Sequence, residues 1–154
     1  MLEKSFTDIY MKFKVHFYQE IFQRINNKEA SLSTIELFCV EMIHAMNEPT
    51  VNEFAKSIQV SSPNAAYKVN CLIKKGYIEK VQSTKDKREY HLRVTPLYYE
   101  HYNLSQNYLT QVVERAEEHF PKEDIDKVDK VLREITNGLM PEAMTVSTDK
   151  EENA

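Results

Sequence analysis

Residues 51–96, VNEFAKSIQVSSPNAAYKVNCLIKKGYIEKVQSTKDKREYHLRVTP, contain a change in apolar periodicity that decides the fold. Up to Lys75 the apolar residues recur three or four positions apart, as on helices. From Tyr77 the β-branched and aromatic residues alternate in part, over 77–82 and again over 89–95, as on strands. The charged, turn-prone STKDKR lies between these two runs. The stretch therefore predicts two helices followed by a two-stranded hairpin with a polar tip.

Capping residues mark the ends of these two helices. Thr50 is placed to cap the first, a short helix of about two turns. Ser62 can cap the second, with Pro63 at the first helical position, where a missing N–H costs nothing. Gly76 suits the position just after that helix, because glycine adopts left-handed backbone angles without strain. We therefore expect the hairpin to begin directly after Gly76.

Two amphipathic helices are predicted before this stretch. The first is indicated by an apolar stripe at helical spacing through Phe6, Ile9, Tyr10, Phe13, Phe17, Ile21 and Ile25. The second begins at Ser33 and carries apolar residues at Ile35, Phe38, Cys39, Met42 and Met46.

Two more helices are predicted after Pro96. Helical spacing predicts one long helix with apolar residues at Tyr98, Tyr102, Leu109, Val112, Val113 and Ala116. Pro121 with Glu123 and Asp124 opens a last helix, which carries Ile125, Val128, Val131, Leu132, Ile135 and Leu139. The polar tail from Pro141 is predicted to be disordered.

The composition agrees with a mainly α fold that contains a small β-hairpin. Only two Gly and five Pro occur among 154 residues, so few turns and much helix are expected. The predicted layout places N-terminal helices at 1–48, a central module at 49–96, C-terminal helices at 97–140 and the disordered tail at 141–154.

The charge is unevenly distributed along the chain. The net charge is -4, yet residues 49–96 hold nine Lys and Arg against four Asp and Glu. A basic middle between acidic ends indicates that this module meets an anion.

Several classes of protein are not expected. No apolar run approaches the ~18 residues of a membrane helix, and the first residues lack a signal-peptide pattern, which favours a cytoplasmic protein without a membrane partner. Neither a glycine-rich phosphate loop nor a nucleophile elbow nor a His-Glu-x-x-His motif occurs. Hence no catalytic residue, cofactor or enzyme activity is predicted.

The helix before Gly76 has two different faces. Helical geometry places Ala65, Ala66, Val69, Leu72 and Ile73 on one face and Asn64, Tyr67, Lys68, Cys71, Lys74 and Lys75 on the other. Asn, Lys and Tyr reach base edges or phosphates, and the capped N-terminus offers free N–H groups. Taken alone, the helix fits either a solvated surface or a DNA major groove.

The order of the elements favours DNA. A short helix, a tight turn, a capped helix with a basic face and a hairpin with a basic tip form a winged helix-turn-helix, in which the hairpin is the wing. Residues 51–96 also resemble the multiple-antibiotic-resistance-regulator (MarR) family of bacterial regulators. The matching positions are Leu72, Gly76, Ile78, Asp86, Arg88 and Thr95, and the flanking helices match by layout.

The resemblance implies a function and a set of site residues. It implies a homodimeric, sequence-specific repressor that binds a pseudopalindromic double-stranded DNA operator and responds to a ligand. Arg88 would enter the minor groove, and Asp86 would orient it. The helix would present Ser62, Asn64, Tyr67 and Lys68 to the major groove, with Lys75, Lys85 and Lys87 near phosphates.

Two alternatives stay open on the residues alone. The first is a winged-helix adaptor that binds proteins or dimerises without DNA; it would need neither the basic wing nor the exposed helix face. The second concerns the aromatic residues, which are either core and dimer contacts or, as the resemblance implies, the lining of a pocket for a small aromatic or lipid-like effector. The candidate pocket residues are Tyr10, Phe13, Phe17, Tyr98 and Tyr102.

A metal- or redox-sensing variant of the regulator is a further alternative. Cys71 on the polar face of the helix is either a redox switch or a small filler, whereas Cys39 beside Phe38 is expected to be a buried filler. The only plausible zinc donors are Glu41, His44, Glu100 and His101, whose convergence a sequence does not reveal, so no metal site is predicted.

Overall fold

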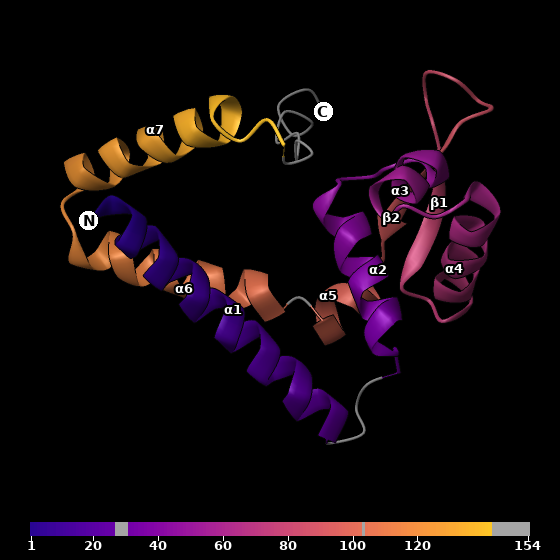
Figure 1. Ribbon diagram of the computed structural model, residues 1–154, viewed down its shortest axis with the longest axis horizontal. Coiled ribbons are helices and arrows are strands. Elements are labelled where there is room, and N and C mark those ends of the chain that lie inside the picture. The colour runs from indigo at the N-terminus through magenta and orange to yellow at the C-terminus, as the bar shows by residue number, and fades with distance from the viewer. Residues whose placement is uncertain (27–30, 103, 143–154) are drawn as a thin grey trace. The chain divides into compact units, whose positions relative to one another are not determined.

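The computed structural model describes residues 1–26, 31–102 and 104–142 (Figure 1). The chain divides into two compact units, one built from residues 1–30 with 102–142 and the other containing residues 31–101. The helices are α1 (Leu2–Asn26), α2 (Thr34–Ala45), α3 (Val51–Ser57), α4 (Ser62–Lys74), α5 (Pro96–Tyr102), α6 (Leu104–His119) and α7 (Lys122–Gly138). The strands are β1 (Ile78–Gln82) and β2 (Tyr90–Val94).

The unit of residues 31–101 is a winged helix-turn-helix. The helices α2, α3 and α4 pack on a two-stranded antiparallel sheet, in which Ile78 pairs with Val94 and Gln82 with Tyr90 (Figure 1). A single bridge from Thr50 to His91 adds the turn before α3 to the edge of β2. The core of this unit is formed by Val40, Ile43, Phe54, Ala65, Val69, Leu72, Tyr77, Ile78, Leu92 and Tyr98. The predicted fold class, mainly α with a small β-hairpin, is confirmed.

The helix starts are fixed by side-chain caps. Ser33 and Glu36 form a reciprocal capping box at α2, and Thr50 and Glu53 form the same arrangement at α3. The predicted cap of α4 was wrong by one residue: Ser61, not Ser62, accepts the backbone N–H of Asn64. Two adjacent serines precede Pro63, and only the backbone angles decide which of them caps the helix.

The buried stripe of α2 also differs from the prediction. The predicted stripe comprises Ile35, Phe38, Cys39, Met42 and Met46, but Ile35 is 60% and Phe38 50% exposed. The residues buried on α2 are Leu37, Cys39, Val40 and Ile43. Because both sets recur at helical spacing, the periodicity alone does not say which one meets α4 and β2.

The other unit contains α1, α6 and α7. The Phe13 ring of α1 meets Tyr108 of α6 edge to face at 5.3 Å, and His16 stacks on the same ring at 3.8 Å. After Pro96 the structure has two helices, α5 and α6, in place of the one long helix predicted; residue 103 between them lies outside the described residues. The tail prediction likewise falls on 143–154, outside the described residues.

The last helix, α7, is strongly amphipathic and none of its residues is buried. Its apolar residues Val128, Val131 and Leu132 are about half exposed, while Lys127 with Glu123 and Arg133 with Asp129 form ion pairs at helical spacing. Over the described ranges, none of the helices combines the length and the apolar character that crossing a membrane requires.

Candidate nucleic-acid interface

The exposed face of α4 carries the side chains predicted for DNA recognition. Tyr67 is 72% exposed, Asn64 is exposed and Lys68 is partly exposed, whereas Ala65, Val69 and Leu72 are buried. The burial thus separates a core face from a polar face, as the sequence predicted. The exposed first turn of α4 also presents its N-terminal N–H groups, which favour an anion such as a phosphate.

Ser62 links α4 to α3. Its hydroxyl donates to Oδ1 of Asn52 at 2.9 Å, so one of the predicted DNA contacts also joins the first turns of the two helices. The chain turns between these helices at Gln59, which has a φ of 56°. Residues other than Gly and Asn rarely adopt this left-handed backbone angle.

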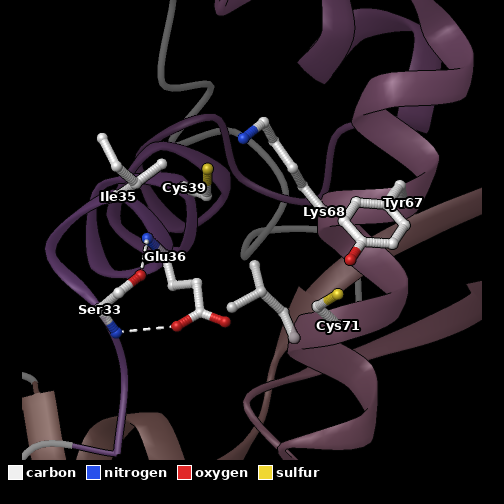
Figure 2. A pocket seen from close by; sticks show the side chains of 8 residues that line it. Ser33, Ile35, Glu36, Cys39, Tyr67, Lys68 and Cys71 are labelled. Carbon is white, nitrogen blue, oxygen red and sulfur yellow. Dashed lines mark hydrogen bonds between the residues drawn. The ribbon is translucent and has the colours of Figure 1, made fainter.

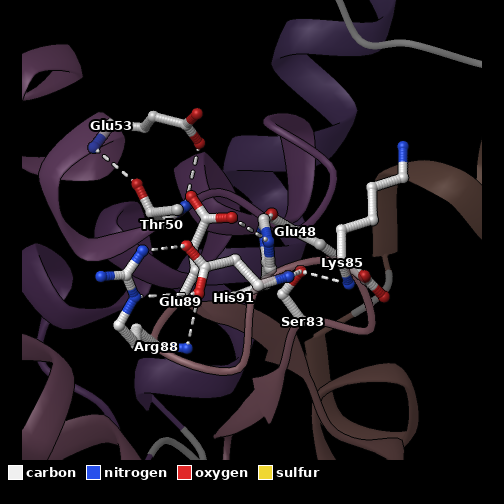
Figure 3. A network of polar contacts seen from close by, with 9 residues as sticks. Glu48, Thr50, Glu53, Ser83, Lys85, Arg88, Glu89 and His91 are labelled. Atoms are coloured by element: carbon white, nitrogen blue, oxygen red, sulfur yellow. Dashed lines mark hydrogen bonds and ion pairs between the residues drawn. The ribbon is translucent and has the colours of Figure 1, made fainter.

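The wing tip is organised around Asp86, which bonds with Ser83 and Arg88, both labelled in Figure 3. Its carboxylate accepts the backbone N–H of Arg88 at 2.9 Å and two guanidinium N–H groups of the same residue, each at 3.3 Å. These hydrogen bonds lower the pKa of the Asp86 carboxyl. Ser83 closes the turn from the other side, because its hydroxyl oxygen accepts the N–H groups of Lys85 and Asp86.

The base of the wing is fastened to the turn between α2 and α3. The carboxylate of Glu48 accepts from Nε of Arg93 at 2.6 Å, and its backbone carbonyl lies 2.8 Å from Nδ1 of His91. The next carbonyl, that of Pro49, accepts the N–H of Leu92 at 2.8 Å. The hydrogen bond to the Glu48 carboxylate raises the pKa of the Arg93 guanidinium. The wing is anchored at its base, and its tip extends into solvent.

Lys75 lies at the other end of α4. It was predicted to lie near phosphates, and its ammonium donates to Oε2 of Glu36 at 2.8 Å and to the carbonyl of Ser31 at 3.1 Å. Lys85 and Lys87 are exposed on the wing. Of the predicted cations, Lys75 is thus bound within the module while Lys85 and Lys87 project from it.

A cleft of about 340 Å³ opens between α2 and α4 (Figure 2). Its lining includes Tyr67 and Lys68 of the polar face and both cysteines. Cys39 is buried as predicted, and burial raises the pKa of its thiol. Cys71 is partly exposed, so its role as a redox switch stays a prediction.

The five predicted effector-pocket residues do not line this cleft. Tyr10, Phe13, Phe17 and Tyr102 belong to one unit and Tyr98 to the other. Tyr98 is buried against α2, where its hydroxyl donates to Glu41 at 2.7 Å. Within the described ranges, no group of three or more His, Cys, Asp or Glu side chains could hold a metal ion.

Sequence reasoning missed the residues that position the interface. Glu36, Glu48, Asn52 and Arg93 were not singled out, although each takes part in a hydrogen bond that holds the recognition helix or the wing. The signal available was weak: Glu36 and Glu53 fit capping boxes three residues after Ser33 and Thr50. A capping pattern does not reveal that the same carboxylate also holds a lysine far along the chain.

Fold and surface together define the class: a winged helix-turn-helix protein with an exposed recognition helix and a basic wing. Residues 32–90 match the family model of the MarR family. This match assigns residues 32–90, which include α2, α3, α4 and most of the wing, to the MarR family. No curated protein matches the chain.

Solved structures share the fold over most of the chain. A mutant of MepR from a multidrug-resistant clinical isolate of S. aureus is 15% identical with a TM-score of 0.58, over 90% of this chain and 97% of that one. A MarR family protein from Bacillus stearothermophilus is 13% identical with a TM-score of 0.56, over 90% and 93%. FabT of Streptococcus pneumoniae, solved in complex with DNA, is 23% identical with a TM-score of 0.55, over 92% and 97%.

Proposed function

We propose that this chain is a homodimeric repressor that binds a pseudopalindromic operator and releases it when a small ligand binds. The observation that carries the proposal is the wing tip, where an exposed guanidinium is held in place by a neighbouring carboxylate. A preorganised arginine suits the narrow, electronegative minor groove of DNA. A protein-binding adaptor has no need of such a group.

In this proposal α4 lies in the major groove. Asn64, Tyr67 and Lys68 face base edges and phosphates, and Ser62 contributes from the first turn. Arg88 enters the adjacent minor groove, while Lys85 and Lys87 lie near the backbone of the duplex. Since its partner is operator DNA, we place the protein in the cytoplasm.

The proposed dimer uses the apolar faces of the terminal helices. On α7, Val128, Val131 and Leu132 are about half exposed, and on α1, Ile9 and Phe22 are more than half exposed. Exposing such apolar stripes to water costs free energy, and two copies of the chain can bury them against each other. A two-fold dimer would place its two α4 helices on half-sites about one helical turn apart, which requires a pseudopalindrome.

The ligand is proposed to be a small aromatic or lipid-like molecule. Exposed Tyr10 and half-buried Phe13 and Phe17 offer aromatic surface on α1. Binding there releases DNA only if the ligand prefers the dimer geometry that cannot span successive grooves. A ligand found by screening aromatic and fatty acids for operator release should bind less tightly to a Phe17→Ala variant. Equal affinity would contradict this placement.

The proposal is tested by selecting bound sequences from a library of random DNA duplexes. We expect enrichment of one pseudopalindrome, and hydroxyl-radical footprints on two half-sites about one turn apart. Analytical ultracentrifugation of the complex should give two chains per duplex. If no sequence is enriched above the starting library, the operator-binding function is wrong.

A further inference from the structure

The C-terminal end of α4 is tied to the start of α2 by one carboxylate oxygen. Oε2 of Glu36 accepts the Lys75 ammonium at 2.8 Å and the backbone N–H of Ser33 at 2.8 Å. The same ammonium also donates to the carbonyl of Ser31 at 3.1 Å. The pair therefore joins the first turn of α2 to the residue that caps the recognition helix.

The residues that follow Lys75 are held from two further elements. The hydroxyl of Tyr77 hydrogen-bonds with that of Ser31 and, at 3.1 Å, with Nδ1 of His101 in α5. The hydroxyl of Thr95, just after β2, donates to the carbonyl of Gly76 at 2.5 Å. Because Tyr77 is also buried in the core, the end of α4 has little freedom to move.

The charge of Lys75 is compensated inside the module. The side chain of Lys75 is 40% exposed and that of Glu36 is 24% exposed, so water screens the pair only in part. The bound ammonium lowers the pKa of the Glu36 carboxyl, which keeps it ionised near neutral pH. These two oxygens take two of the three ammonium N–H groups, so at most one is left for a phosphate.

We propose that Glu36 and Lys75 are positioning residues, which set the tilt of α4 in the major groove, and that Lys75 does not bind phosphate. This inference rests on the proposed operator-binding function. The helical rise puts Lys75 about 10 Å along the axis from Lys68. A small change of tilt at the Lys75 end of α4 therefore displaces the residues that are proposed to contact bases. Hydrogen bonds to base edges tolerate such displacement poorly, whereas contacts to phosphates tolerate it well.

The variant Glu36→Gln separates the two roles of this side chain. Glutamine serves at the same position of a capping box, so the start of α2 is retained while the charged pair is lost. Glu53→Gln is the matched control: it removes the same charge from the same capping position at α3. Lys75→Gln and the double variant Glu36→Gln with Lys75→Gln complete the set.

The positioning role predicts a distinctive pattern in gel-shift titrations on the selected duplex and on an unrelated duplex of equal length. Glu36→Gln and Lys75→Gln should each weaken operator binding about tenfold, and the double variant should be no weaker than either one. Affinity for the unrelated duplex should change no more than it does in Glu53→Gln, and the salt dependence of operator binding should stay as in the wild type.

A phosphate contact by Lys75 predicts the reverse pattern. Lys75→Gln would then weaken binding to both duplexes and lower the salt slope by about one. Glu36→Gln would then strengthen binding to both duplexes, because it frees a cation and removes an anion. Either of these outcomes would overturn the proposal.

A measurement without DNA tests whether the Glu36–Lys75 ion pair holds the end of α4 in place. In hydrogen exchange, the amides of Lys75, Gly76 and Tyr77 should exchange faster in Glu36→Gln and Lys75→Gln than in the wild type or Glu53→Gln. Unchanged exchange would refute the positioning role, whatever the DNA results are. If the wild type selects no duplex, the proposed function fails and the exchange data still decide whether the tie exists.

Discussion

Arg88 donates from Nε and Nη2 to the two carboxylate oxygens of Asp86, each over 3.3 Å, while 91% of its side chain stays exposed. The Asp86 carboxylate accepts two of the five guanidinium N–H groups, and this holds the planar guanidinium in one orientation. An arginine in solution loses side-chain entropy when it enters a groove, and this one has already lost part of it. The pair is therefore suited to entering a groove at low cost.

Arg88→Ala is expected to weaken operator binding by at least ~1 kcal/mol and to make its salt dependence shallower. The reason is the loss of one charged group from the minor groove, not a change in fold, because the side chain is almost fully exposed. Gel-shift titrations at several salt concentrations measure both effects. Ultracentrifugation should find the dimer unchanged, and an unaltered affinity would contradict the wing assignment.

Asp86→Asn provides the companion control. Removing a negative charge near DNA would by itself strengthen binding to any duplex. We expect operator binding to weaken instead, since Arg88 is no longer held, while binding to unrelated DNA stays equal or rises. Stronger binding to both duplexes would show that Asp86 does not position Arg88.

Leu132→Glu on α7 is expected to convert the dimer to a monomer. It places a charge in the middle of the exposed stripe that contains Val128 and Val131, where burial of an unpaired carboxylate is costly. Lys130→Glu, on the charged face of the same helix, is the matched control and should stay dimeric. Sedimentation velocity at micromolar concentration distinguishes the two, and a dimeric Leu132→Glu would exclude this interface.

Local chemistry explains what could be predicted from the sequence. The winged helix follows from periodicity, from the caps at Ser33 and Thr50, and from Gly76, whose φ is 86°. All of these act between residues close together in the chain. The family resemblance implied that Asp86 orients Arg88, and the two side chains do meet in one tight turn; the entry of Arg88 into a minor groove stays a prediction.

Long-range contacts explain what could not be predicted. Glu36 and Lys75 are 39 positions apart, and Glu48 and Arg93 are 45 apart, so no spacing rule joins them. The choice between the two apolar stripes of α2 depends on what packs against that helix. The cap at Ser61 was missed because its neighbour offers the same hydroxyl.

Gln59→Gly is expected to stabilise the helix-turn-helix by about 1 kcal/mol, since a left-handed angle costs most side chains roughly 1–2 kcal/mol and Gly nothing. Gln59 has a φ of 56° and is exposed, so few contacts are lost. Gln59→Ala is the control, because alanine keeps the unfavourable angle and should bring no gain. Urea denaturation followed by circular dichroism gives the free energies of unfolding. A gain in the Ala variant equal to that in the Gly variant would contradict the strain explanation.

His44 should make the stability of the winged helix depend on pH. Burial lowers the pKa of this imidazole, which contacts the rings of Tyr98 and Tyr99. Since the folded-state pKa lies below the unfolded value of about 6.5, the unfolded chain binds more protons, and stability is lost as pH falls below about 6.5. Glu41, one turn earlier on α2 and bound by the neutral Tyr98 hydroxyl, acts in the opposite direction. Burial raises the pKa of its carboxyl, so its contribution falls as pH rises above about 4.3.

His44→Asn should therefore lose less stability than the wild type between pH 7.5 and pH 5.5, and Glu41→Gln should lose more. Comparing each variant with the wild type at both pH values cancels the titration of groups common to all three. Urea midpoints measured at the two pH values provide the test. The urea midpoints of the wild type and of His44→Asn could instead change by the same amount between the two pH values. The imidazole would then be protonated equally easily in the folded and unfolded chains, and its burial against α5 would not make stability depend on pH.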